Sequence, residues 1–235
     1  IKLEADCFID ATGDANLAAM CGCEFQLGRE KDNLCQPMTL CFRLINVDLD
    51  EYKKEREGIN PLYKQFKEKG LIENPREDVL IFENLMDGVL HFNSTRVVKL
   101  DPTNPYEVSQ SEVIARKQII ELHKFLRENF KAFKDSQLMV SAPSIGTRES
   151  RKIKGEYVMT VEDIVNATKF SDSIAAGNYD IDIHNPEGTG TSHYRIPEGE
   201  WYTIPYRSLI PKGMKNLLVG GRCISATHEA QASVR

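Results

Sequence analysis

The chain has 235 residues, of which 41% are hydrophobic and 28% charged, with a formal net charge of −5 at pH 7. This is a globular composition, long enough for one large domain or two small ones. The negative charge argues against nucleic acid as the main partner, because phosphate binding favours a basic surface. No apolar run approaches the roughly 18 residues of a membrane-spanning helix, and no signal peptide opens the chain, so no membrane partner is expected.

The six cysteines are irregularly spaced, unlike the framework of a disulfide-rich protein: Cys7, Cys21, Cys23, Cys35, Cys41 and Cys223. We therefore expect reduced thiols and a cytoplasmic location. Cys21-Gly-Cys23 has one residue fewer between its cysteines than the usual zinc motif C-x₂-C. Buried thiols are the favoured interpretation there, and we predict no metal site.

The first elements follow from apolar periodicity and turn residues. Residues 5–11 form a predicted buried strand that ends at Thr12-Gly13-Asp14, and residues 15–20 make one or two helical turns. Alternation of apolar and polar side chains predicts a strand over residues 38–47. Asn60-Pro61 then opens a predicted helix that Gly70 closes.

The middle of the chain combines a hairpin with the longest predicted helix. Residues 79–85 and 89–92 flank an Asp-Gly turn, which favours a β-hairpin. A helix is predicted over residues 110–130, with Ser109 and Glu112 at capping-box spacing. Its apolar stripe consists of Ile119, Leu122, Phe125, Leu126 and Phe130.

The last third continues the mixture of helices and strands. The predicted elements are a strand at residues 138–140, a helix capped at Thr160 and reaching Thr168, a strand at 179–183, a loop at 185–200, a strand at 201–210, a strand before Gly220, and a helix after Thr227. The single tryptophan, Trp201, is expected in the core. Helices and strands alternate without βαβ regularity over residues 35–205, which predicts an α+β fold with a largely antiparallel sheet.

Two apolar strands end in glycine-containing turns. Leu217–Val219 meets Gly220-Gly221 and then a small-residue stretch, and the first strand meets Thr12-Gly13-Asp14. Such turns expose backbone N–H groups where a cofactor can approach closely. The simpler alternative is an ordinary strand-to-helix turn. No G-x-G-x-x-G motif follows any strand, so these residues lack a pyrophosphate cradle and we expect them to bind a dinucleotide weakly.

Three segments carry a resemblance to a known family: Ile9-Asp-Ala-Thr-Gly-Asp14, Ser141 to Tyr157, and Asn216 to Arg235. The chain resembles bacterial FAD-dependent oxidoreductases with a glutathione-reductase-type FAD domain. The resemblance implies that residues 1–34 and 206–235 belong to an FAD-binding α/β domain and that residues 35–205 form the substrate or cap domain. It also implies that the chain is a fragment lacking the dinucleotide fingerprint, and that residues 1–14 and 206–235 lie side by side.

The same resemblance implies which residues contact FAD. They are Ala11, Thr12, Gly13, Asp14, Gly220, Gly221, Arg222, Ala230, Gln231 and Ala232. Many flavoproteins carry Gly-Asp where this chain has Gly221-Arg222, which leaves the contact to the ribityl chain unassigned. The helix after Thr227 would direct its positive end toward the flavin ring.

Candidate catalytic residues lie in the family-like segments. Arg148 and Arg151, three residues apart and on one face if helical, would bind an anionic substrate group; the alternative is an ion pair with Glu149 or Glu156. His228 would act as a general acid or base beside the flavin, or else serve as a core or capping histidine.

Asp182 and His184 alternate on one face of their strand and could form an acid–base couple, or bind a metal together with Asp180 or His193. The leading function is hydride transfer between a small organic substrate and the flavin. A flavin-free binding or scaffold module, an isolated cap domain, and a metal-dependent hydrolase are the alternatives, and the oligomeric state is left open.

Overall fold

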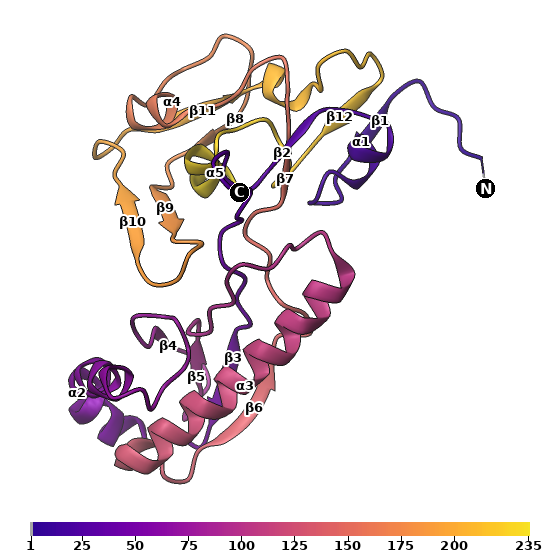
Figure 1. Ribbon diagram of the computed structural model, residues 1–235. Coiled ribbons are helices and arrows are strands. Elements are labelled where there is room, and N and C mark those ends of the chain that lie inside the picture. The colour runs from indigo at the N-terminus through magenta and orange to yellow at the C-terminus, as the bar shows by residue number, and fades with distance from the viewer. Residues whose placement is uncertain (1) are drawn as a thin grey trace.

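The structure is a computed structural model that describes residues 2–235. Its apolar cores divide the chain into two lobes, which are seen one above the other in Figure 1. The four-stranded lobe comprises residues 38–145 and has a core of its own. The second lobe comprises residues 2–37 and 146–235 and contains two smaller apolar clusters.

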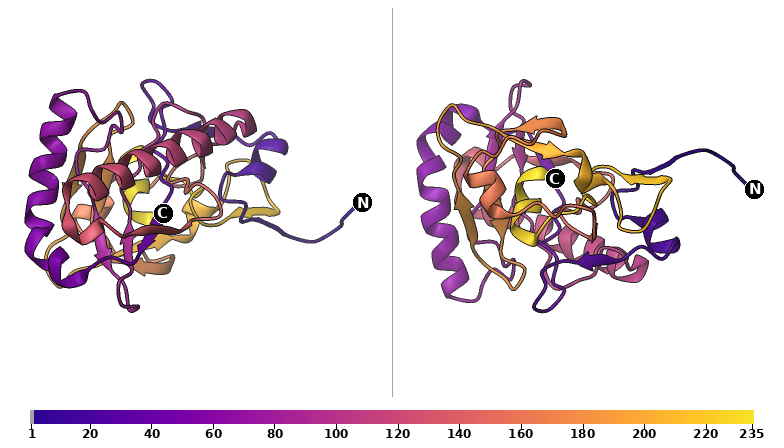
Figure 2. Two further views of the ribbon diagram at one scale, coloured as in Figure 1. Left: turned by 90° about the horizontal axis from the view of Figure 1, so that it is seen from below. Right: turned by 90° about the horizontal axis from the view of Figure 1, so that it is seen from above.

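The four-stranded lobe is an antiparallel sheet in the order β4-β5-β3-β6, with two long helices. Its elements are β3 (Phe42–Ile45), α2 (Leu49–Glu68), β4 (Ile81–Glu83), β5 (Leu90–Phe92), α3 (Pro105–Asn129), the short helix η1 (Lys131–Phe133) and β6 (Gln137–Ser141). Leu40, Phe42 and Leu44 alternate onto the buried face, where they join apolar residues of both helices. The α3 stripe predicted from the sequence is buried there as well. Figure 2 shows the two helices from two further directions.

Helix α2 begins twelve residues before the predicted start at Pro61, so that prediction was wrong. Asp48 caps the helix by accepting hydrogen bonds from the backbone N–H groups of Asp50 and Glu51. Pro61 lies inside the helix, which is held on either side of it by the buried Ile59 and Tyr63. Tertiary burial therefore outweighs the local preference of proline for a helix start.

Helix α3 also begins earlier than predicted, and Ser109 does not cap it. Asn104 is the capping residue, accepting from Tyr106 N, and Pro105 occupies the first turn. Ser109 instead donates to the carbonyl of Pro105, one turn back along the helix. The capping-box spacing identified a residue pair inside the helix rather than its end.

The second lobe is built from four two-stranded sheets and short helices. Its strands are β1 (Phe8–Asp10), β2 (Phe25–Leu27), β7 (Arg151–Ile153), β8 (Ser173–Gly177), β9 (Ile181–His184), β10 (Thr191–Tyr194), β11 (Tyr202–Pro205) and β12 (Leu217–Val219). Its helices are α1 (Asn16–Met20), α4 (Val161–Val165), η2 (Tyr206–Leu209) and α5 (His228–Val234). Helices and small, largely antiparallel sheets confirm the α+β class.

The two ends of the chain meet as expected. Strands β1 and β12 pair in parallel, with Phe8 opposite Leu217 and Asp10 opposite Val219. The two glycine-containing turns that follow these strands therefore emerge at the same edge. The domain boundaries at residues 34 and 205 stay predictions.

Two local predictions in the second lobe were wrong. Residues 185–200 are not all loop, because β10 pairs with β9 in this stretch. Trp201 is half exposed rather than in the core, and the ammonium group of Lys169 lies 4.1 Å from its ring centroid. Strands β2, β7 and β8 were not predicted, because each owes its place to a distant partner strand.

No helix within residues 2–235 has both the length and the apolar character needed to cross a lipid bilayer.

Candidate active site

The turn after β1 is organised by the buried carboxylate of Asp10. It accepts hydrogen bonds from Thr12 N (3.0 Å), Thr12 Oγ1 (2.7 Å) and Ala18 N (2.8 Å). Burial alone would raise the pKa of Asp10, but these hydrogen bonds outweigh it and lower the pKa. The carboxylate thereby fixes residues 11–14 and the start of α1 relative to the strand.

Arg222 joins the two glycine-containing turns. Its Nη2 lies 3.0 Å from Oδ1 of Asp14. A Cβ atom on Gly13, which has φ of 82°, would approach Nη2 of Arg222 to 2.6 Å, so both the backbone conformation and the guanidinium require glycine there. Ser150 Oγ also donates to Asp14 (2.6 Å), and Arg151 Nη1 donates to the Asp14 carbonyl (3.2 Å).

The second turn leaves open space beside its backbone. A Cβ built on Gly220 or on Gly221 meets no atom within 4 Å, and Gly221 has φ of 85°. Nε of Arg222 is buried without a hydrogen-bond partner among the described residues. Open glycine backbone beside an unsatisfied buried donor fits a polar group that the chain itself does not supply.

A buried cluster of ionisable groups is centred on Glu149, which precedes Ser150, the residue that donates to Asp14 of the first turn. Glu149 is fully buried, and its carboxylate accepts from Lys152 Nζ (2.5 Å) and from His228 Nδ1 (2.8 Å). Burial would raise the pKa of Glu149, but the bond to His228 and the charge of Lys152 lower it below its ordinary value. Lys152 also donates to the carbonyl of Gly28 (2.9 Å).

The contact with Glu149 sets the orientation of the His228 ring. Because a carboxylate only accepts, Nδ1 of His228 carries the hydrogen, and Nε2 makes no hydrogen bond within residues 2–235. His228 lines a hollow of about 620 Å³ together with residues of β9, β10 and β7 and the segment before α5. Glu149 therefore fixes the orientation of the His228 ring through Nδ1, and Nε2 remains available to a substrate.

Arg148 is a largely buried cation without an acidic partner. Its Nη1 donates to the carbonyl of Pro37 (2.8 Å) and to the hydroxyl of Thr39. No carboxylate within residues 2–235 forms an ion pair with it, and neither Glu149 nor Glu156 takes that part. Burial, reinforced by the charges of Arg235, Arg76 and Arg96, lowers the pKa of Arg148 to about 10. An anion placed there would relieve this repulsion.

Arg148 and Arg151 are not on a helix. Residues 148–150 lack regular structure and Arg151 begins β7, so the two guanidinium groups diverge. Arg148 reaches Thr39 of the four-stranded lobe, whereas Arg151 reaches Asp14 and the side chain of Asn16.

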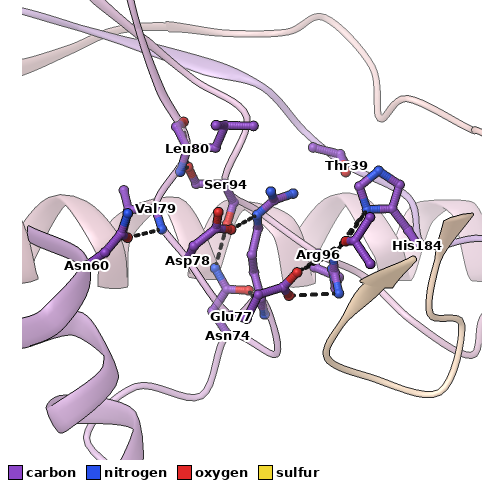
Figure 3. Close-up of polar contacts among 12 residues, drawn as sticks. Thr39, Asn60, Asn74, Glu77, Asp78, Val79, Leu80, Ser94, Arg96 and His184 are labelled. Atoms are coloured by element: carbon purple, nitrogen blue, oxygen red, sulfur yellow. Dashed lines mark hydrogen bonds and ion pairs between the residues drawn. The ribbon is translucent and has the colours of Figure 1, made fainter. Parts of the chain in front are cut away.

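Asp182 and His184 face one another as predicted, with 3.3 Å between Oδ2 and Nε2. Arg96 approaches the other ring nitrogen, Nδ1, at 3.1 Å (Figure 3). Arginine can only donate, so Nδ1 accepts and the hydrogen is on Nε2, facing Asp182. Burial, together with the charges of Arg148 and Arg96, lowers the pKa of His184, which keeps the ring neutral. Both ring nitrogens of His184 therefore have partners, and we interpret the residue as a structural connection between β9 and Arg96.

Arg96 connects the two lobes. It is 1% exposed, and its Nη1 lies 3.0 Å from Oε2 of Glu77. The same nitrogen donates to the carbonyls of Gly188 (3.0 Å) and Gly190 (3.2 Å), in the loop between β9 and β10. Figure 3 shows the side chains of Glu77, Arg96 and His184 in one line of polar contacts.

Gln36 lies at the junction of these networks, and no motif or spacing pointed to it. Its backbone N–H donates to Glu149 (2.9 Å), and its side-chain oxygen accepts from Arg235 (2.5 Å). Its side-chain nitrogen donates to Gln231 (3.3 Å). Glu149, Lys152 and Arg96 were also missed as functional residues, although Glu149 lies inside a family-like segment.

Three of the predicted cofactor contacts lie on α5. The side chains of Ala230 and Ala232 are buried in an apolar cluster with Met159 and Ile164. Gln231 donates to the carbonyl of Arg148 (2.9 Å). Within residues 2–235 no group of three or more metal-ligating side chains is placed to hold an ion.

A family model described as "FAD dependent oxidoreductase" matches residues 1–235, and the chain belongs to this family. Its cofactor is FAD, and the protein is a flavin-dependent enzyme in this general sense. No curated protein and no solved structure matches the chain.

Proposed function

We propose that the protein transfers hydride between a small organic substrate and FAD. The contact of His228 Nδ1 with the buried Glu149 carries this proposal, because it presents an oriented imidazole at the start of α5, the helix that follows the second glycine-containing turn. In the proposal, residues 1–34 and 206–235 form the FAD-binding part and residues 35–205 the substrate part. The partner is a small molecule, and the setting is the cytoplasm.

The residues that would hold FAD are those that fit a missing polar group. Gly220 and Gly221 offer unobstructed backbone, and Arg222 offers the unsatisfied Nε. Asp10 keeps the turn at residues 11–14 in place behind them. When bound, FAD supplies the two-electron chemistry.

Arg148 would bind an anionic group of the substrate. It is held on one side by Pro37 and Thr39 and has no acid of its own. A charge-assisted hydrogen bond to a guanidinium contributes about 1.5–3 kcal/mol. Arg148 therefore orients the substrate rather than reacting with it.

His228 would move the proton. Nδ1 remains hydrogen-bonded to Glu149, while Nε2 accepts or releases a proton at a substrate oxygen or nitrogen. Glu149 would hold the ring in place during this transfer, because its carboxylate accepts the hydrogen of Nδ1 at 2.8 Å.

Anaerobic mixing of the FAD-loaded protein with panels of small organic acids and alcohols tests the proposal. A substrate should bleach the flavin absorbance in a single exponential phase, with a rate that depends on pH. Absence of bound flavin in the complete protein would instead favour the alternative, a binding or scaffold module that does not use the cofactor.

A further inference from the structure

One face of the four-stranded sheet is not covered by the helices. Leu40, Phe42 and Leu44 point into the core, so Thr39, Cys41 and Arg43 share the opposite face. The strand register extends this face sideways: Arg43 is opposite His91 on β5 and Val140 on β6, and Phe82 on β4 is opposite His91. The four side chains form one row across the sheet, because directly paired residues lie on the same side.

The row borders a small, largely apolar hollow whose lining includes an arginine and a histidine. A cavity of about 250 Å³ is lined by Cys41, Arg43, His91, Val140 and Ser141, among others. Nδ1 of His91 is buried without a partner, and burial together with the charge of Arg43 lowers the pKa of His91. No carboxylate within residues 2–235 forms an ion pair with Arg43. The hollow thus has a cation and an unsatisfied ring nitrogen but no acid.

Residues 39–43 connect the hollow to the contact that Arg148 makes with Thr39. Arg148 binds the hydroxyl of Thr39, which is four residues before Arg43 on the same face. Four residues of strand span about 13 Å. Cys41 lies between them, and after burial, which raises its pKa, the charge of Arg148 is the strongest influence on that thiol. Arg148 and Arg43, neither of them ion-paired within the described residues, therefore lie at the two ends of residues 39–43, a segment that is buried at Thr39 and exposed at Arg43.

We propose that Arg43 and His91 form a second anion-binding subsite, so that the substrate carries two acidic groups joined by an apolar body. One acidic group lies at Arg148, as in the proposed function on which this inference rests, and the other at Arg43 and His91. Phe82 and Val140, each about half exposed, contact the apolar body at the edge of the hollow. The substrate class is an elongated dicarboxylate.

The test uses adipate, which has two carboxylates, and hexanoate, which has one, on the FAD-loaded protein. The pKa of His91 is followed by NMR of its imidazole Cε1–H signal. We expect saturating adipate to raise this pKa by about 1, because an adjacent carboxylate favours the charged ring. Hexanoate should bind at least tenfold more weakly, since it can satisfy only one of the two cations.

Arg43→Gln should weaken adipate binding about tenfold and remove most of the His91 response. Arg56→Gln is the matched control, because Arg56 is an exposed surface arginine of α2, 4.0 Å from Glu83. Equal adipate affinity in wild type and Arg43→Gln would overturn the proposal, and so would a His91 pKa unchanged by adipate. These readouts do not involve flavin reduction. A normal His91 response without substrate-driven bleaching therefore counts against the proposed function alone.

Discussion

Oε2 of Glu149 lies 2.8 Å from Nδ1 of His228, and both side chains are buried although 79 residues separate them in sequence. The same carboxylate group neutralises the buried Lys152. One acid therefore stabilises a structural cation and orients the candidate catalytic imidazole.

Replacing Glu149 by glutamine should destabilise the fold. The amide keeps the size of the side chain but leaves Lys152 charged, buried and without a counter-ion, which costs about 3 kcal/mol. Urea denaturation measures the loss. Glu24→Gln is the control, because Glu24 and Lys154 form an exposed ion pair whose removal should change stability by less than about 0.5 kcal/mol. Equal effects of the two substitutions would show that the buried pair has no special role.

Arg148→Gln and His228→Asn should slow substrate-driven flavin reduction while leaving flavin content and thermal stability close to wild type. Loss of a guanidinium contact to an anion predicts a decrease of about tenfold to a hundredfold for Arg148→Gln. His228→Asn should in addition flatten the pH dependence of the reduction rate, because the proton acceptor is gone. Stopped-flow absorbance on both variants gives the rates, and rates equal to wild type would assign these residues a structural role.

Gly221→Val should abolish flavin retention, both because Gly221 has φ of 85° and because the branched side chain fills the open space. Gly220→Ala separates the two causes. Its Cβ meets no atom of the chain within 4 Å, so the melting temperature should hold while bound flavin falls. Cys23→Ala, a buried change to which we assign no cofactor contact, should retain flavin. Full flavin content in Gly220→Ala would place the cofactor elsewhere.

Arg96→Leu should loosen the attachment of the β9–β10 loop to the four-stranded lobe. The carbonyls of Gly188 and Gly190 lose their donor, and Glu77 loses its cation. We expect a loss of about 3 kcal/mol in the free energy of unfolding. This is the lower end of the range of about 3–5 kcal/mol for breaking a buried ion pair, because Glu77 is partly exposed. Hydrogen exchange should accelerate in residues 185–191, with Arg56→Leu as the surface control. Unchanged exchange in that loop would contradict the assigned link.

Stability should decline in acid between about pH 4 and pH 2. Burial would raise the pKa of Asp182, but its hydrogen bond to His184 and the nearby cations lower it to about 2. A carboxyl whose pKa is lower in the folded than in the unfolded state stabilises the fold above the unfolded pKa, and this contribution disappears as the pH falls through the folded value. Asp10 and Glu149 act in the same direction.

The measurement is the urea midpoint as a function of pH. Asp182→Asn should give a shallower fall below pH 4 than wild type, whereas Asp87→Asn, in the exposed turn before β5, should not change the slope. Parallel curves for wild type and Asp182→Asn would argue against the assigned pKa.

Local sequence signals were reliable where the cause of structure was itself local. Thr160 caps α4 as predicted, although the helix ends at Val165 rather than Thr168, and the predicted hairpin joins β4 to β5. They failed where a distant contact outweighed them, as at Pro61 inside α2 and at β10, which depends on pairing with β9. Capping and turn geometry involve neighbouring residues, whereas strand pairing and burial do not.

The sequence by itself determined the family, the two strand–glycine turns and the α+β class, because glycine conformations, caps and apolar periodicity are written in consecutive residues. The tertiary structure decided which charges meet. In the folded chain Glu149 contacts His228, and Arg96 contacts Glu77 and His184. Within residues 2–235, Arg148 and Arg43 form no ion pair with a carboxylate. These partners are remote in the sequence. Which buried ionisable groups contact one another therefore depends on how the two lobes pack, not on the number of residues between them. The chemistry of the site therefore depends on contacts that no local pattern contains.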